Sequence, residues 1–166
     1  MKEFLINLFN LRSEITHICP TIPEPVIIPK TNGERLYDFS MGFYSIDPTP
    51  KDIQPDGFAC VESLTTILDL FMGYPLMTYT PTFLEYIKKD IRFKPTTEFK
   101  KGVIIISPTG TGNGKIVGHT GIIGENGKIL SNSSLSGLWF DKFDQVSWIE
   151  RYSRQGNLSL YLFELV

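Results

Sequence analysis

Two short segments of the chain carry residue types that together could form a nucleophilic site. Cys60 lies in the stretch Asp-Gly-Phe-Ala-Cys-Val-Glu-Ser, which we expect to open a helix, and His119 lies in Gly-His-Thr-Gly-Ile-Ile-Gly, which we expect to form a strand. A thiol in the first turn of a helix has a lowered pKa because the helix dipole favours the thiolate. An imidazole within reach can accept the thiol proton and later donate it to a leaving group. The two segments therefore predict a Cys–His pair.

The chain contains only two cysteines and two histidines, so few other pairs can be formed. Cys19 and His17 are a rival pair, but we expect an extended segment there, without a helix to lower the pKa of the thiol. A disulfide between Cys19 and Cys60 is a further alternative, and it would abolish the proposed chemistry. The spacing of these residues is not typical of a zinc site, and we expect no metal or cofactor.

The residues after His119 predict a hairpin. Asn126-Gly127 is typical of a two-residue type I′ turn, which would join a strand over residues 116–125 to a strand over residues 128–133. In that register Gly121 faces Asn132. A bulge or a different turn type would shift the register by one residue and move Asn132 to the other face of the sheet.

The same register would place His119 opposite Ser134 and on the same face as Asn132. An Asn carbonyl oxygen can accept a hydrogen bond from one imidazole nitrogen and direct the other nitrogen towards Cys60. The hairpin therefore predicts a Cys-His-Asn arrangement of nucleophile, base and orienting residue.

Three segments resemble the papain-like cell-wall cysteine hydrolases, which include the NlpC-type peptidases, the CHAP-type amidases and phage endolysin-like enzymes. These segments are residues 55–63, 105–114 and 118–132, within a resemblance that covers about residues 36 to 152. The sequence Ala59-Cys60-Val61 departs from the Asp-Cys-Ser that is usual in the NlpC-type enzymes. Their upstream aromatic-Gly-Gly segment has no clear equivalent, although Tyr44 could substitute for its tyrosine.

The resemblance implies an α+β, papain-like (NlpC/CHAP-type) core, with N-terminal helices packed on an antiparallel sheet. It makes Cys60 the nucleophile, His119 the base and Asn132 the orienting residue. It also implies cleavage of an amide bond in the peptide of bacterial peptidoglycan, through an acyl-enzyme on Cys60. Two alternatives stay open: a protease or acyltransferase with a substrate outside the wall, and a non-catalytic binding or virion-structural module.

Three further positions are candidates for substrate binding besides Tyr44. Thr109 and Gly110 begin a glycine-rich loop that we expect to form a flexible rim beside the site. The loop does not fit the phosphate-binding pattern GxxxxGK[ST], because Thr109 occupies the first glycine position and Ile116 follows Lys115. Trp139 is either a core residue or a platform for stacking a sugar ring.

The pattern of apolar residues predicts helices first and strands afterwards, an order typical of α+β proteins. A helix that begins near Asp56 should end before Gly73, and another should have Thr80 as its cap and Pro81 in its first turn. The predicted helices are residues 34–44, 58–72 and 80–90; the predicted strands are 102–107, 116–125, 128–133, 137–141 and 158–166, with 143–152 either helical or irregular.

The N-terminal residues 1–30 differ from the predicted hydrolase domain at 31–166. Residues 3–15 have the periodicity of an amphipathic helix, and a proline-rich tether follows. We expect this helix to pack on the body of the domain; docking to a partner or to a membrane surface is the alternative.

The composition limits the classes of partner. A net charge of −2 gives no electrostatic argument for nucleic acid. No segment approaches the roughly 20 apolar residues of a membrane span, and the N-terminus is unlike a secretory signal. We therefore expect synthesis in a cytoplasm and, for action at the bacterial wall, delivery by a phage holin or a virion.

Overall fold

The computed structural model describes residues 28–49, 59–110, 116–133 and 136–166. This part of the chain is α+β, with four α-helices and a six-stranded antiparallel sheet. The elements are α1 (Asn32–Ser40), α2 (Ala59–Met72), α3 (Thr80–Lys89), β1 (Phe93–Thr96), β2 (Ile104–Ser107), β3 (His119–Ile123), β4 (Lys128–Asn132), β5 (Trp139–Asp144), α4 (Gln145–Trp148) and β6 (Tyr161–Leu165). The predicted helix at 3–15, Cys19, His17 and the predicted cap Asp56 lie outside the described residues.

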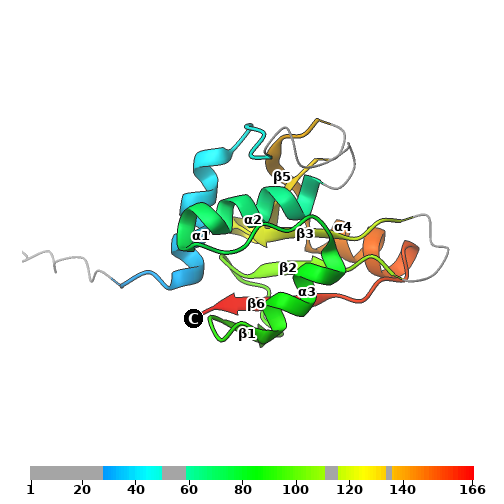
Figure 1. Cartoon of the computed structure of the whole chain (residues 1–166). Coiled ribbons are helices and arrows are strands. Elements are labelled where there is room, and N and C mark those ends of the chain that lie inside the picture. The colour runs from blue at the N-terminus through cyan, green and yellow to red at the C-terminus, as the bar shows by residue number, and fades with distance from the viewer. Residues whose placement is uncertain (1–27, 50–58, 111–115, 134–135) are drawn as a thin grey trace, which may run out of the picture.

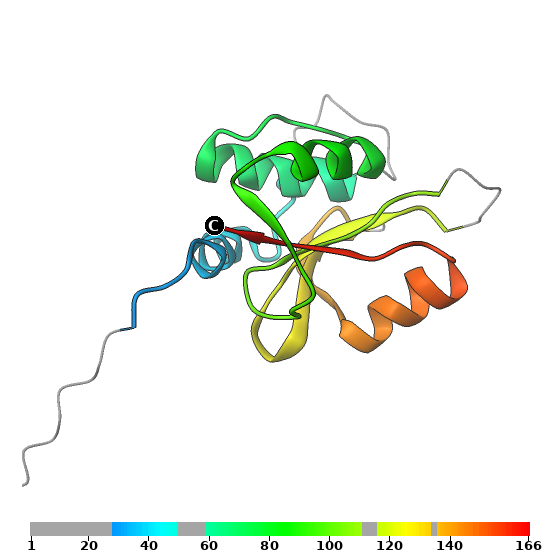
Figure 2. The same ribbon diagram turned by 90° about the horizontal axis from the view of Figure 1, so that it is seen from below.

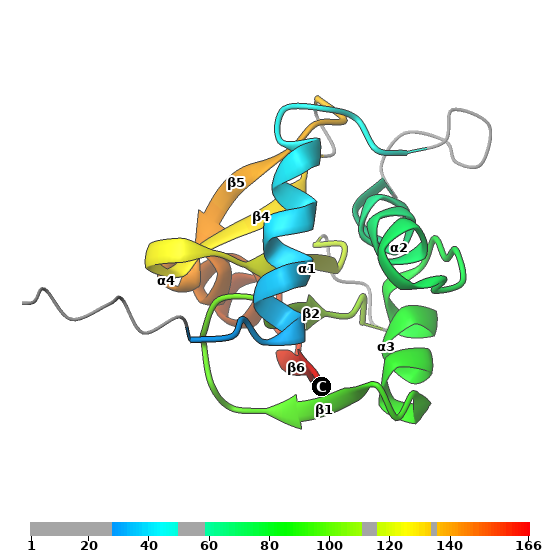
Figure 3. The ribbon, with the colours of Figure 1, turned by 90° about the vertical axis from the view of Figure 1, so that its left-hand side faces the viewer.

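The sheet has the strand order β1-β6-β2-β3-β4-β5 and separates two layers of helix (Figure 1). Figure 2 shows α2 and α3 on one side of the sheet, and α4 with the π-helix Ile149–Gln155 on the other. Helix α1 lies across one end of the sheet, beside α2 (Figure 3). The backbone of its first turn, at Gly33, lies against the backbone of Gly102. A Cβ at position 102 would be only 2.1 Å from a Gly33 backbone atom, so this contact requires a glycine.

Local sequence signals explain how the helices begin and end. Helix α1 has a capping box, in which the Thr31 side chain accepts from the Glu34 N–H and the Glu34 carboxylate accepts from the Thr31 N–H. Helix α2 ends before Gly73, whose φ of +67° is the left-handed conformation predicted for that position. The predicted cap of α3 is wrong by one residue: Tyr79 is the cap, and Thr80 is the first helical residue.

The strands follow the prediction with one omission. Strand β1 was not predicted, because Pro95 and two charged or polar neighbours obscure its pattern. It tolerates the proline because it lies at the edge of the sheet, where it pairs only with β6. The region 143–152, left open between helix and irregular structure, contains α4 and the start of the π-helix.

Each face of the sheet has its own apolar core. The first core lies under α1, α2 and α3 and contains Cys60, Leu64 and Ile122. The second lies under α4 and contains Ile123, Trp148 and Tyr152. Because neighbouring residues of a strand point to opposite faces, Ile122 and Ile123 belong to different cores. No helix in the described part of the chain is both long enough and apolar enough to cross a bilayer.

Candidate functional site

Cys60 occupies the first turn of α2, as predicted, and faces the sheet. Its Sγ lies 4.0 Å from the carbonyl oxygen of Gly118, the residue before β3. Only 8% of Cys60 is exposed, and it packs in the first core. The helix therefore brings the thiol to the backbone that leads directly into His119.

The environment of the thiol favours its neutral form. Burial raises the pKa of Cys60 to about 11, although backbone N–H groups of Thr120, Val61 and Cys60 itself act in the opposite direction by hydrogen bonding to the sulfur. A group with this pKa is almost entirely protonated at neutral pH. The effect of burial thus exceeds that of the helix N-terminus on which the sequence prediction depended.

A small cavity lies beside the thiol. It has a volume of about 10 Å³, and its lining includes Cys60, Tyr79, Thr80, Thr109 and Gly118. This is roughly the space that one water molecule needs, so a substrate can reach the sulfur only if the walls move apart.

Thr80 and Thr109 hold one wall of this cavity together. The Thr109 N–H donates to the Thr80 hydroxyl at 2.9 Å, and the Gly118 N–H donates to the Thr109 hydroxyl at 2.9 Å. Thr109, predicted to line the site, does lie beside Cys60. Gly110 follows it and is exposed. The sequence does not predict the contribution of Thr80, because Thr80-Pro81 is a typical helix start and carries no other signal.

His119 is the first residue of β3, but its ring faces away from α2. The ring stacks on Trp148 and Tyr152, with centroid separations of 5.4 and 5.5 Å, and meets the edge of Phe143 at 5.7 Å. These three aromatic residues belong to the second core. The thiol and the imidazole therefore belong to different cores, on opposite faces of the sheet.

The aromatic layer keeps the imidazole neutral. Burial lowers the pKa of His119 to about 3, and the positive charges of Lys142 and Arg151 add to the effect. Nε2 of His119 is buried and has no hydrogen-bond partner. A neutral imidazole with an unoccupied nitrogen is the form that a general base requires, but here the nitrogen is buried and the ring lies in the second core.

The predicted register of the hairpin is wrong by one residue. Asn126 and Gly127 have the expected positive φ values, 54° and 69°. The Lys128 N–H donates to the Glu125 carbonyl, as a two-residue turn requires, but the Gly124 N–H also donates to the Lys128 carbonyl. Gly124 and Glu125 therefore both oppose Lys128 and form a bulge beside the turn. Strands β3 and β4 consequently pair Ile122 with Leu130 instead of placing Gly121 opposite Asn132.

The shift moves Asn132 to the face of the sheet opposite His119. Asn132 alternates with Leu130 and shares the face of the first core, where α2 and Cys60 lie. Its Nδ2 donates to the Gly137 carbonyl at 2.6 Å, while its Oδ1 is buried without a partner. The structure therefore does not bring Asn132 to the imidazole, and the side chain instead holds the loop that leads to β5.

The other two predicted binding residues lie apart from the thiol. Trp139 is fully buried in the first core and pairs with Asn132 across β4 and β5, so it packs in the core instead of presenting a stacking surface. Tyr44 is 42% exposed and donates to Asp141. It lines a different hollow, which shares no residue with the cavity at Cys60.

Among the described residues, no three His, Cys, Asp or Glu side chains lie together as a metal site would require. Comparisons with protein-family models and with curated proteins find no match for this chain. The arguments about function therefore come from the residues and their geometry.

Proposed function

We propose that this protein is a cysteine hydrolase that cleaves an amide bond in the peptide of bacterial peptidoglycan, with Cys60 as nucleophile. The observation that carries the proposal is the position of Cys60, at the N-terminal turn of α2 and in contact with the Gly118 backbone. The choice of reaction and of substrate comes from the resemblance of three segments to papain-like cell-wall hydrolases.

The reaction would proceed in two steps. The Cys60 sulfur attacks the amide carbonyl, the C–N bond breaks, and the proton from the thiol passes through the base to the departing amine. Water then attacks the thioester, which releases the carboxylic acid and restores the thiol. Backbone N–H groups at the start of α2 are suitable donors for the oxyanion, because they are unpaired within the helix.

His119 is the proposed base, and this role requires a rearrangement. Its imidazole must leave Trp148 and Tyr152 and turn to the face of the sheet that Cys60 occupies. His119 is the end residue of β3, so the rotation involves the end of the strand and not its centre. The state described here would then be an unassembled one, with a neutral thiol and a neutral imidazole.

A second candidate function is a non-catalytic binding module. It is favoured by the burial of Cys60 and by the three aromatic contacts of His119, both of which are typical of structural core residues. In that case Cys60 would be inert and its reactivity independent of His119.

The test measures alkylation of Cys60 by iodoacetamide as a function of pH. A Cys19→Ser background leaves Cys60 as the only thiol, and His119→Ala is compared with it. A catalytic pair predicts reaction well below pH 8.5, about the pKa of a free cysteine, and loss of this low-pH reactivity in His119→Ala. If Cys60 is inert, or if its reactivity does not change in His119→Ala, the hydrolase proposal is wrong and the binding module is the better account.

The substrate is tested separately with purified peptidoglycan. Digestion should release new amino and carboxyl ends, detected by mass spectrometry, and Cys60→Ser should release none. Reactivity of the thiol without cleavage of any wall would point to a different amide substrate.

A further inference from the structure

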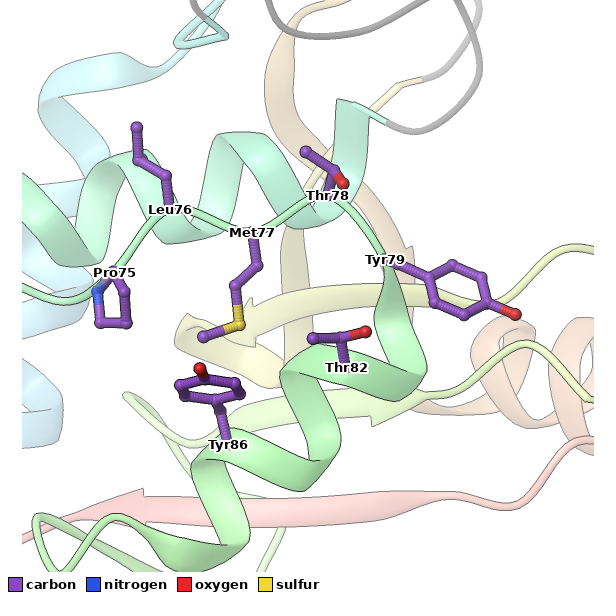
Figure 4. A pocket seen from close by; sticks show the side chains of 7 residues that line it. All are labelled: Pro75, Leu76, Met77, Thr78, Tyr79, Thr82 and Tyr86. Atoms are coloured by element: carbon purple, nitrogen blue, oxygen red, sulfur yellow. The ribbon is translucent and has the colours of Figure 1, made fainter.

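A groove runs between residues 75–79 and helix α3, close to the cavity at Cys60. Its volume is about 300 Å³, and its walls include Leu76, Met77, Tyr79, Thr82 and Tyr86. Figure 4 shows the Met77 side chain pointing across the groove towards Tyr86, while Leu76 and Thr78 point away from α3. None of the lining side chains is charged, so a ligand here would be held by hydrogen bonds to backbone groups and to Thr and Tyr hydroxyls, and by apolar contact.

One wall of the groove offers unpaired backbone groups. The Met77 N–H donates to the Thr65 hydroxyl at 3.1 Å, and the Met77 carbonyl oxygen lies 3.1 Å from the same hydroxyl. Both polar groups of residue 77 therefore face α2. Within the described part of the chain, the backbone groups of Leu76 and Thr78 have no hydrogen-bond partner. Such an edge can pair with an added extended strand.

The groove continues to the thiol. Thr78 and Tyr79 line both the groove and the small cavity at Cys60. A chain lying along residues 76–78 would therefore be led towards Tyr79 and the sulfur beyond it.

We propose that this groove binds the peptide chain of the substrate as an extended strand, paired with the backbone of Leu76 and Thr78. The inference rests on the proposed function and assigns its substrate-binding cleft. A peptide is the proposed occupant, because the unpaired backbone groups of Leu76 and Thr78 can form the hydrogen bonds of an added strand. Tyr86 and Met77 form the apolar floor on which the peptide side chains would pack.

Binding can be measured without any chemistry in a Cys60→Ala protein labelled with ¹⁵N. The probe is a soluble wall stem tetrapeptide, and an N-acetylglucosamine tetramer is the glycan comparison. The proposal predicts that the tetrapeptide shifts the amide resonances of Leu76 and Thr78 and that the sugar does not. It is overturned when the tetrapeptide leaves both resonances unmoved, or when the sugar alone shifts them.

Two variants in the same background sharpen the test. Thr82→Trp places a large ring in the groove from the exposed side of α3 and should weaken tetrapeptide binding about tenfold, equivalent to ~1.4 kcal/mol. Ile91→Ala, at a side chain 91% exposed and outside the groove, should leave the affinity within about twofold. Unchanged affinity in Thr82→Trp would contradict the proposal that the peptide binds in this groove. If Thr82→Trp does not fold, Tyr86→Ala replaces it, and the same loss of affinity is expected.

The two proposals fail in different ways. If Cys60 is inert but the tetrapeptide shifts the Leu76 and Thr78 resonances, the hydrolase proposal is wrong and the peptide-binding groove is supported. If Cys60 is reactive but the resonances do not move, the proposal that Cys60 is a nucleophile is supported, and the substrate binds outside this groove.

Discussion

The two faces of the sheet surround the two candidate catalytic groups with different kinds of side chain. On the α2 face, Cys60 lies beside Tyr79, Thr80 and Thr109, and backbone amides hydrogen bond to its sulfur. On the α4 face, His119 is surrounded by three aromatic rings with two cations nearby. Both surroundings suppress charge, because burial raises the pKa of a thiol and lowers that of an imidazole. A Cys–His ion pair thus needs both groups to leave these layers, and each layer can be tested by itself.

The largest expected effect is on the α4 face, from Trp148→Ala. Trp148 is fully buried, stacks on His119 and donates from Nε1 to Ser107 at 3.0 Å. Removal of a buried indole should lower the free energy of unfolding by about 3–5 kcal/mol. Chemical denaturation measures this loss, with Val146→Ala, at an exposed side chain of the same helix, as the control. A loss as small as that of the control would mean that the aromatic layer does not stabilise the fold.

The next effect is the pH dependence of stability, which reports on the α4 face through His119. His119 has a pKa of about 3 in the fold against 6.5 when unperturbed, so the unfolded chain binds more protons between these values. The free energy of unfolding should therefore decrease as the pH falls through this range, by about 2 kcal/mol between pH 6.5 and pH 4.5 from this residue alone.

The variant His119→Phe isolates that contribution, since it keeps an aromatic ring and removes the titrating group. Urea denaturation of both proteins at several pH values gives the difference in slope. Parallel pH profiles would show that the imidazole is hydrated in the fold, in conflict with its position between Trp148 and Tyr152.

The smallest effect is on the α2 face, from two neighbouring threonines. The Thr65 hydroxyl accepts from the Met77 N–H, whereas the buried Thr66 hydroxyl has no partner. Thr65→Val should lower the free energy of unfolding by about 1 kcal/mol, because it leaves a buried amide unpaired, and Thr66→Val should be neutral or stabilising. Thermal unfolding compares the two variants. Equal effects would contradict the anchoring of residue 77 on which the open edge at Leu76 and Thr78 depends.

Much of the fold follows from local patterns in the sequence. The helix that carries Cys60 ends at Gly73, where only a left-handed residue fits, and the positive φ values at Asn126 and Gly127 were predicted from residue type. Strand β1 escaped prediction because its pairing with β6 is a long-range contact that Pro95 disguises.

The geometry of the candidate site could not be predicted from local sequence patterns. A regular hairpin and the bulged one share the Asn126-Gly127 turn and differ by one hydrogen bond. The Lys128 carbonyl accepts from the Glu125 N–H in the regular hairpin and from the Gly124 N–H in the bulged one, which the structure contains. That one bond decides whether Asn132 lies beside His119 or on the opposite face, since a shift of one residue exchanges the faces of a strand. Turn residues alone do not determine this choice, because the packing of Leu130 and Ile129 into separate cores contributes to it.

The α+β class, the helix with Cys60 in its first turn and a strand that contains His119 can all be predicted from the sequence, because short-range periodicity and capping encode these features. The packed fold sets which face of the sheet each group occupies and how deeply each is buried. It also brings Thr80, Thr109 and residues 78–79 to the thiol. Those properties depend on contacts between residues far apart in the chain. The pKa of each group depends on the same contacts, because burial is a property of the packed molecule and not of the residue.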